Sequence, residues 1–232
     1  MKRLVFIFAF LILCAAVQAN ARGIMTMCGA GVPVVAAGIT LDASLCQRVA
    51  NEDNQVSHSQ GSLTNGIAIV MLGWAPNAAT GVSVSYGGSA MTKISDVNRS
   101  GLYFSQIYKL DLGTSSSGSK TVLADYNGTM YSSMMCVRTY SGVEQSAEFT
   151  TGTVEAWGNA PSISIATGAS GVVLAGLSAG DTTITEGQTL IAEYKGSQSY
   201  GFQGAAGTGG NVAMGWSLGA SVHYAASAVV LK

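Results

Sequence analysis

From Gln55 to its end, the chain consists mostly of short apolar runs separated by clusters of Gly, Ser, Asn and Thr. In the run 211–218, Val212, Met214 and Trp216 alternate with small or polar residues. Alternation with a period of two is the pattern of a β-strand that packs one face against a core. Such runs predict strands at residues 55–60, 66–74, 82–86, 102–112, 120–126, 131–140, 162–166, 171–178, 189–195, 211–218 and 222–231.

The spacing of these runs and the turns between them indicate the fold class. Strands recur about every 8–15 residues, and turn signals such as Gly87-Gly88 and Asn127-Gly128 separate them. Ten or eleven strands fit two packed sheets better than one open sheet. We therefore expect an all-β, two-sheet antiparallel β-sandwich, jelly-roll-like, of about 10–11 strands.

The N-terminus has the three parts of a secretory signal peptide. Lys2 and Arg3 precede an apolar run from Leu4, and Val17-Gln18-Ala19 forms a small-residue cleavage site. The apolar run of residues 4–17 has 14 residues, whereas a helix that spans a membrane needs about 20. We expect residues 1–19 to be removed, so that the protein is secreted or held at the cell surface with no transmembrane span.

Residues 20–54 differ from the rest of the chain. The segment 23–40 is apolar and Gly-rich and lacks alternation, so it is either an ordinary N-terminal segment or an exchangeable one used in self-assembly through residues 20–40. Leu41, Leu45 and Val49 recur every four residues and make residues 39–51 the best candidate helix. We expect this leader to end at residue 54 and one β-sandwich domain to occupy residues 55–232.

Three cysteines remain after cleavage: Cys28, Cys46 and Cys136. In an oxidising compartment Cys28 and Cys46 could close a short loop worth about 3 kcal/mol, leaving Cys136 as a small apolar residue in a strand. The alternative is three unpaired buried thiols. No CxxC motif or Cys/His cluster indicates a metal site.

Charge composition excludes one class of partner. The chain has 11 basic and 12 acidic residues, so removal of Lys2 and Arg3 leaves 9 against 12, a net charge of −3. Nucleic-acid binding normally requires a basic field, and nucleic acid is therefore not an expected partner. Charged residues are only 10% of the chain, against about 25% in ordinary domains, which is common in extracellular β proteins and structural subunits.

Several short motifs carry a family resemblance. Residues 82–93 read VSVSYGGSAMTK, residues 140–145 read YSGVEQ, and Gly187-Gln188-Thr189 and the terminal residues 225–231 continue the pattern. These motifs resemble β-sandwich modules of bacterial secreted and surface proteins and of phage-associated proteins, with a YGG-x-x-(L/M)-T and an S-G-V-x-Q element. The resemblance covers about residues 55–232. It implies the fold, and it implies no catalytic residues.

Candidate ligand-binding residues are aromatic side chains beside amides and carboxylates, because an aromatic face stacks on the C–H groups of a sugar. Trp157 with Asn159 is the first candidate, and Tyr200 with Phe202 is the second. Trp157 could equally cover an edge of the core. Asp181 and Glu186 flank a loop that could ligate Ca²⁺ through hard oxygen ligands, although the loop lacks the dense acidic spacing of a dedicated site. No other cofactor is indicated.

Catalytic motifs are weak. His58 and His223 are the two histidines, no Gly-x-Ser-x-Gly elbow is present, and both histidines are expected to be structural. We expect a non-enzymatic secreted protein that acts by surface contact with an extracellular glycan or protein, in adhesion, carbohydrate binding or assembly of an extracellular or virion layer. The alternative is a jelly-roll polysaccharide-active enzyme with paired carboxylates, drawn from acidic residues such as Glu144, Glu148 and Glu155.

Overall fold

The computed structural model describes residues 25–27, 38–145 and 148–232. These residues form 18 strands and no helix, and so contain no helix that could cross a membrane. The strands are β1 (Met25–Met27), β2 (Thr40–Val49), β3 (Asn54–Gln60), β4 (Leu63–Pro76), β5 (Val82–Tyr86), β6 (Ser89–Ala90), β7 (Thr92–Arg99), β8 (Tyr103–Ser115), β9 (Gly118–Tyr126), β10 (Met130–Ser141), β11 (Thr150–Gly158), β12 (Ser162–Ala166), β13 (Val172–Gly180), β14 (Ile184–Glu186), β15 (Thr189–Tyr194), β16 (Gln198–Ala206), β17 (Asn211–Leu218) and β18 (Val222–Leu231).

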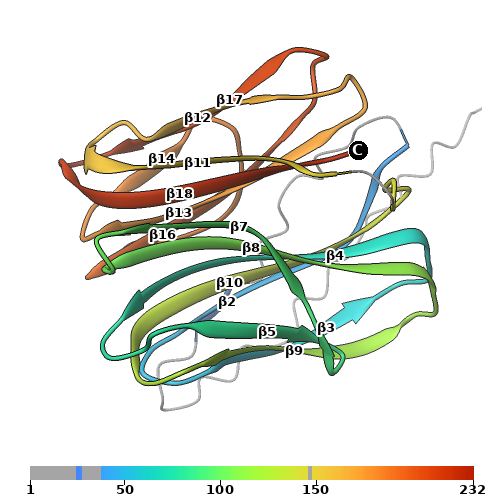
Figure 1. The fold of residues 1–232 in the computed structure, drawn as a ribbon, viewed down its shortest axis with the longest axis horizontal. Helices are drawn as coiled ribbons and strands as arrows, with labels where there is room; N and C mark the ends of the chain where they lie inside the picture. Colours follow the sequence, from blue (N-terminus) through green and yellow to red (C-terminus); the bar gives the residue numbers. More distant parts are fainter. Residues whose placement is uncertain (1–24, 28–37, 146–147) are drawn as a thin grey trace, which may run out of the picture.

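The strands form four antiparallel sheets stacked as layers (Figure 1). The first outer sheet has the order β3-β9-β5-β6, and the first inner sheet has the order β1-β2-β10-β4-β8-β7. The second inner sheet has the order β11-β18-β13-β16-β15, and the second outer sheet has the order β12-β17-β14. Each outer sheet with its inner sheet makes one β-sandwich, here called the first and the second sandwich.

Both sandwiches have the same strand order. If the eight main strands of each half are numbered along the chain, both inner sheets read 1-8-3-6-5 and both outer sheets read 2-7-4. This is the connectivity of a jelly roll, except that strand 5 pairs with strand 6 in the inner sheet and not with strand 4 in the outer sheet. The expected all-β, jelly-roll-like fold is confirmed, but the described residues form two such sandwiches and four sheets, where the sequence predicted one sandwich with two sheets.

Three apolar cores fill the spaces between the four layers. In β4, Ile67, Ile69 and Met71 enter the central core between the inner sheets, while Val70 and Leu72 enter the core of the first sandwich. A third core lies inside the second sandwich, around side chains such as Met214. Because an inner sheet is covered on both faces, its strands are apolar on both faces, as expected for β4.

All eleven expected strands are present, and seven further strands were not predicted. The expected helix at residues 39–51 is wrong, because β2 occupies Thr40–Val49 and pairs with β10. Leu41 and Leu45 enter different cores on opposite faces of that strand, so their spacing of four does not reflect a helical stripe. The β-structure therefore begins well before residue 55. The expected signal peptide 1–19 and the segments 20–24 and 28–37 of the leader lie outside the described residues.

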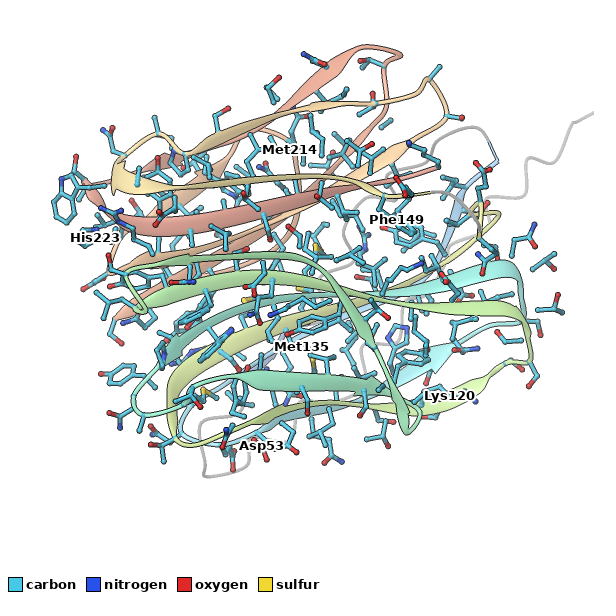
Figure 2. All side chains as sticks on the ribbon, in the orientation of Figure 1. Asp53, Lys120, Met135, Phe149, Met214 and His223 are labelled. Carbon is cyan, nitrogen blue, oxygen red and sulfur yellow. A yellow bond between two sulfur atoms is a disulfide. The ribbon has the colours of Figure 1, made fainter. Side chains whose placement is uncertain are left out.

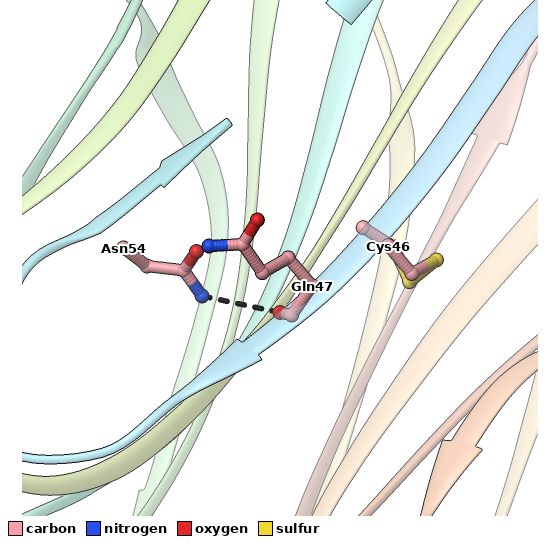
Figure 3. The surroundings of a disulfide bond; sticks show 4 residues. Cys46, Gln47 and Asn54 are labelled. Atoms are coloured by element: carbon pink, nitrogen blue, oxygen red, sulfur yellow. Dashed lines mark hydrogen bonds between the residues drawn. A yellow bond between two sulfur atoms is a disulfide. The ribbon is translucent and has the colours of Figure 1, made fainter. Parts of the chain in front are cut away.

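The disulfide joins Cys46 to Cys136, not Cys28 to Cys46. Cys46 and Cys136 are directly opposed in the β2–β10 pair, and their Cα atoms lie 4.1 Å apart. Next to Cys46 on β2, the main-chain oxygen of Gln47 accepts a hydrogen bond from Nδ2 of Asn54 on β3 at 3.2 Å (Figure 3). The pairing expected from sequence is corrected because Cys136, 90 residues away along the chain, becomes the cross-strand neighbour of Cys46.

Polar contacts also join the two sandwiches. The Tyr200 hydroxyl, on β16, lies 2.6 Å from Ser132 Oγ on β10 and donates to the Ser132 main-chain oxygen at 2.8 Å. Ser105 Oγ on β8 lies 2.7 Å from Ser227 Oγ on β18. The inner sheets are therefore held in one arrangement by directional bonds within an apolar interface.

Candidate functional site

Trp157 is the most exposed large apolar side chain of the described residues, at 59%. It lies on β11, an edge strand of the second inner sheet that pairs only with β18. Its cross-strand neighbour is His223, and the two rings meet edge to face with centroids 4.6 Å apart. Figure 2 places His223 at one end of the second sandwich. The indole is therefore held against a neighbour while most of its surface faces solvent.

Two charged side chains complete this cluster. Arg99, the last residue of β7 in the first sandwich, donates from Nε to His223 Nδ1 at 3.3 Å. Its Nη1 lies 3.5 Å from Glu155 Oε2, two residues before Trp157 on the exposed face of β11. We call Arg99, Glu155, Trp157 and His223 the Trp157 surface.

The Trp157 surface combines an exposed aromatic ring with the hydrogen-bonding groups of a guanidinium, an imidazole and a carboxylate. Both sandwiches contribute to it, since Arg99 comes from the first and the other three residues from the second. Leu102, whose N donates to Arg99 O at 2.9 Å in the β7–β8 turn, has a half-exposed side chain. Such a surface can stack on the apolar face of a ligand and hydrogen-bond the ligand's polar rim.

The sequence identified part of this surface. Trp157 was a candidate, and Asn159 lies exposed just beyond it, with its main-chain oxygen accepting from Leu218 N at 2.8 Å. Arg99 and His223 were not assigned to the site, because their contacts with β11 join distant segments. The alternation of Thr151, Thr153, Glu155 and Trp157 with small residues could have identified β11 as a strand.

Tyr200 and Phe202 are not surface residues. Both lie on β16 and are fully buried in the central core. The prediction that they bind a ligand is wrong, because Gly201 between them belongs to a strand, not to a turn, and both aromatic side chains are buried.

The described residues provide no assembled metal site. Asp181 is exposed just after β13, and Glu186 is the last residue of β14. Nowhere in residues 25–27, 38–145 and 148–232 do three or more His, Cys, Asp or Glu side chains gather so that they could hold an ion. Calcium at Asp181 and Glu186 therefore remains a prediction from sequence.

His58 lies in a buried hydrogen-bond network of the first sandwich. Its Nε2 lies 3.2 Å from Thr139 Oγ1, and this hydroxyl donates to Asp42 Oδ2 at 2.8 Å. Burial lowers the pKa of His58, and the nearby Asp42 carboxylate opposes that shift. In a hydrolase triad the carboxylate would hold the histidine, not the hydroxyl. The arrangement thus favours a structural role for His58.

Comparisons with known proteins leave the family open. No protein-family model matches the sequence, and no curated protein matches it significantly. Among solved structures, a chain from the crystal structure of Cucumber Necrosis Virus is 10% identical, with 94% of this chain and 92% of that chain covered. The TM-score of 0.24 is too low to support an argument about fold or function. The resemblance to bacterial surface modules therefore stays a prediction from the motifs.

Proposed function

We propose that this protein is a secreted, non-enzymatic β-sandwich that acts by surface contact and binds an extracellular glycan through the Trp157 surface. The observation that carries the proposal is the 59% exposed indole of Trp157, held against His223 beside the Arg99–Glu155 pair. An aromatic ring can stack on the C–H face of a sugar, and the neighbouring guanidinium, carboxylate and imidazole can bind its hydroxyl groups.

Export is supported by two independent features. The N-terminal charge, apolar run and small-residue site are those of a signal peptide. The Cys46–Cys136 disulfide is of a kind that persists in oxidising compartments. Mass spectrometry of the exported protein should find Asn20 as its first residue; a chain that still begins at Met1 contradicts cleavage.

The direct test compares glycan binding by the mature protein with binding by one tryptophan variant and one tyrosine variant. We expect Trp157→Ala to abolish binding on a glycan array, because the stacking face is lost. Tyr131→Ala is the matched control, since Tyr131 is also exposed, at 49%, but lies on β10 and outside the Trp157 surface. Equal melting temperatures would show that both variants fold. Absence of binding by the unmodified protein, or equal loss in both variants, refutes the proposal.

Within the Trp157 surface, the enzyme alternative gains no support from Glu155. Its carboxylate is paired with Arg99, and no second carboxylate of the described residues is bonded to this cluster. A glycosidase requires two carboxyl groups about 5–10 Å apart on either side of the scissile bond. Binding without hydrolysis is therefore the expected behaviour of this surface.

A further inference from the structure

The repeated fold allows equivalent positions in the two sandwiches to be compared. Leu72 and Leu177 each lie six residues after a glycine that is followed directly by an apolar run, Gly66 and Gly171 (72 − 66 and 177 − 171). Leu72 pairs with Gln106 of β8, and Leu177 pairs with Gly201 of β16. Gly201 therefore occupies in the second sandwich the position that Gln106 occupies in the first.

The next strand confirms this register. Gln106 pairs with Asp96 of β7, and Gly201 pairs with Glu193 of β15. Each sandwich thus has an acidic residue at this position of the edge strand of its inner sheet. What differs is the residue opposite the acid, which is an amide side chain in one sandwich and no side chain in the other.

In the first sandwich the glutamine completes a closed network. Gln106 Nε2 donates to Asp96 Oδ1 at 2.9 Å. Trp74 Nε1 and the Tyr108 hydroxyl both donate to Gln106 Oε1, at 3.1 and 3.0 Å. Every one of these polar groups has a partner, as buried polar groups normally do.

In the second sandwich two polar groups from the outer sheet meet at this glycine and have no such partner. A Cβ atom at Gly201 would lie 3.1 Å from Glu186 Oε1 and 3.2 Å from Trp216 Nε1, so both atoms converge on this glycine. Both atoms are buried, and neither has a hydrogen-bond partner among the described residues. Trp216 is 96% buried, since only 4% of its surface is exposed. An unpaired buried donor or acceptor costs about 1–3 kcal/mol, which favours a missing partner.

Glu186 and Trp216 also line an open hollow of about 410 Å³ at the edge of the second sandwich, together with Pro161, Thr185 and Gly215. Glu186 ends β14, an edge strand of the outer sheet, and Glu193 lies on β15, an edge strand of the inner sheet. Burial and the nearby Glu193 carboxylate raise the pKa of Glu186 to about 7, so that its carboxyl group can accept or donate a hydrogen bond near neutral pH. Glu193 is partly exposed and pairs with Lys195 at 3.1 Å.

We infer that Glu186 and Trp216, over Gly201, form a second binding site that takes a hydroxyl group of a neutral saccharide unit. The hydroxyl oxygen accepts from Trp216 Nε1–H, and the hydroxyl proton is donated to Glu186 Oε1. An anion would be repelled by Glu186 and Glu193, and a cation would face the N–H end of the indole. This site is separate from the Trp157 surface and does not depend on sugar binding there.

Indole N–H signals in NMR spectra provide a direct test, because the chain has three tryptophans. Trp216→Phe identifies the Trp216 signal. The mature protein is then titrated with glucose, galactose, mannose and N-acetylglucosamine, each alone, and separately with CaCl₂. We expect at least one sugar to shift the Trp216 signal in a saturable way and CaCl₂ to leave it unchanged. No shift with any of these sugars, or a shift with calcium alone, overturns the inference.

Variants decide whether the shift reports this site. Gly201→Gln restores the glutamine of the first sandwich and should abolish the sugar-induced shift. Glu186→Gln keeps the shape of the side chain and should weaken sugar binding, measured by the Trp216 signal, at least tenfold. It also tests the site if Gly201→Gln fails to fold. Trp157→Ala is the control and should leave the Trp216 titration unchanged. An unchanged titration in Glu186→Gln overturns the inference, whatever the result at the Trp157 surface.

Discussion

The Cys46–Cys136 disulfide gives the sharpest prediction about stability. It closes a loop of 90 residues between two adjacent strands of the first inner sheet. In the chain-entropy model such a loop lowers the entropy of the unfolded chain enough to stabilise the fold by about 4.5 kcal/mol. The Cys28–Cys46 bridge expected from sequence would close a much shorter loop, worth about 3 kcal/mol.

Single substitutions distinguish the two pairings. Cys46→Ala and Cys136→Ala should each lower the free energy of unfolding by about 3–5 kcal/mol, measured by guanidinium titration with tryptophan fluorescence. The double variant should lose little more than either single variant, because one bridge can be removed only once. Cys28→Ala should change nothing.

The reasoning is refuted if Cys28→Ala destabilises the protein as much as Cys46→Ala while Cys136→Ala is neutral. Peptide mapping without reduction provides an independent measurement, and it should recover the peptides of Cys46 and Cys136 as one linked species. Both cysteines are buried, so loss of side-chain packing contributes to each single variant. That contribution is additive in the double variant, whereas loss of the bridge is not.

Three further predictions concern the second sandwich and its contact with the first. The pKa of Glu186 is raised from 4.5 to about 7, so the fold should lose about 1–2 kcal/mol of stability as pH rises from 4.5 to 7, allowing for the solvent around a partly buried group. Glu186→Gln should flatten the pH dependence of guanidinium unfolding. An equally steep profile in that variant contradicts the assignment. Tyr200→Phe removes both hydrogen bonds to Ser132 and should cost about 1–3 kcal/mol in the same assay, while an unchanged free energy of unfolding would show that these bonds are not formed in solution. Gly73→Ala should lower the melting temperature, because the added Cβ would lie 2.7 Å from Tyr200 Cδ1, and an equal melting temperature means that the inner sheets pack less tightly than described.

The sequence by itself determined the local structure of most strands. Alternation and turn residues placed strands such as β5, β12 and β17 within their observed bounds, because the period of two is a local property of the chain. Seven strands were missed for local reasons as well. β11 and β16 are rich in small residues and glycine, which weakens the apolar signal, and β2 has apolar residues on both faces.

Only the tertiary structure decided how the strands are combined. Gly66 and Gly171 are each followed directly by an apolar run and were a signal of the repeat, but the repeated order 1-8-3-6-5 became visible only from the pairing of distant strands. The same pairing made Cys136 the neighbour of Cys46 and buried Tyr200 under the first sandwich. An aromatic residue has the same sequence signature in a core and on a surface, so burial depends on what lies opposite.

For the candidate sites, the sequence determined the residue types and the tertiary structure determined their partners. Trp157 was recognisable as an aromatic residue near polar groups, but its contact with His223 joins residues 66 apart, and the Arg99–Glu155 ion pair beside it joins residues 56 apart (223 − 157 and 155 − 99). Glu186 and Trp216 meet because β14 pairs with β17, and both side chains reach the backbone of Gly201 because a glycine has no side chain to displace them. Hydrogen bonds and packing act over a few ångströms, so these sites exist only where the folded chain brings distant residues together.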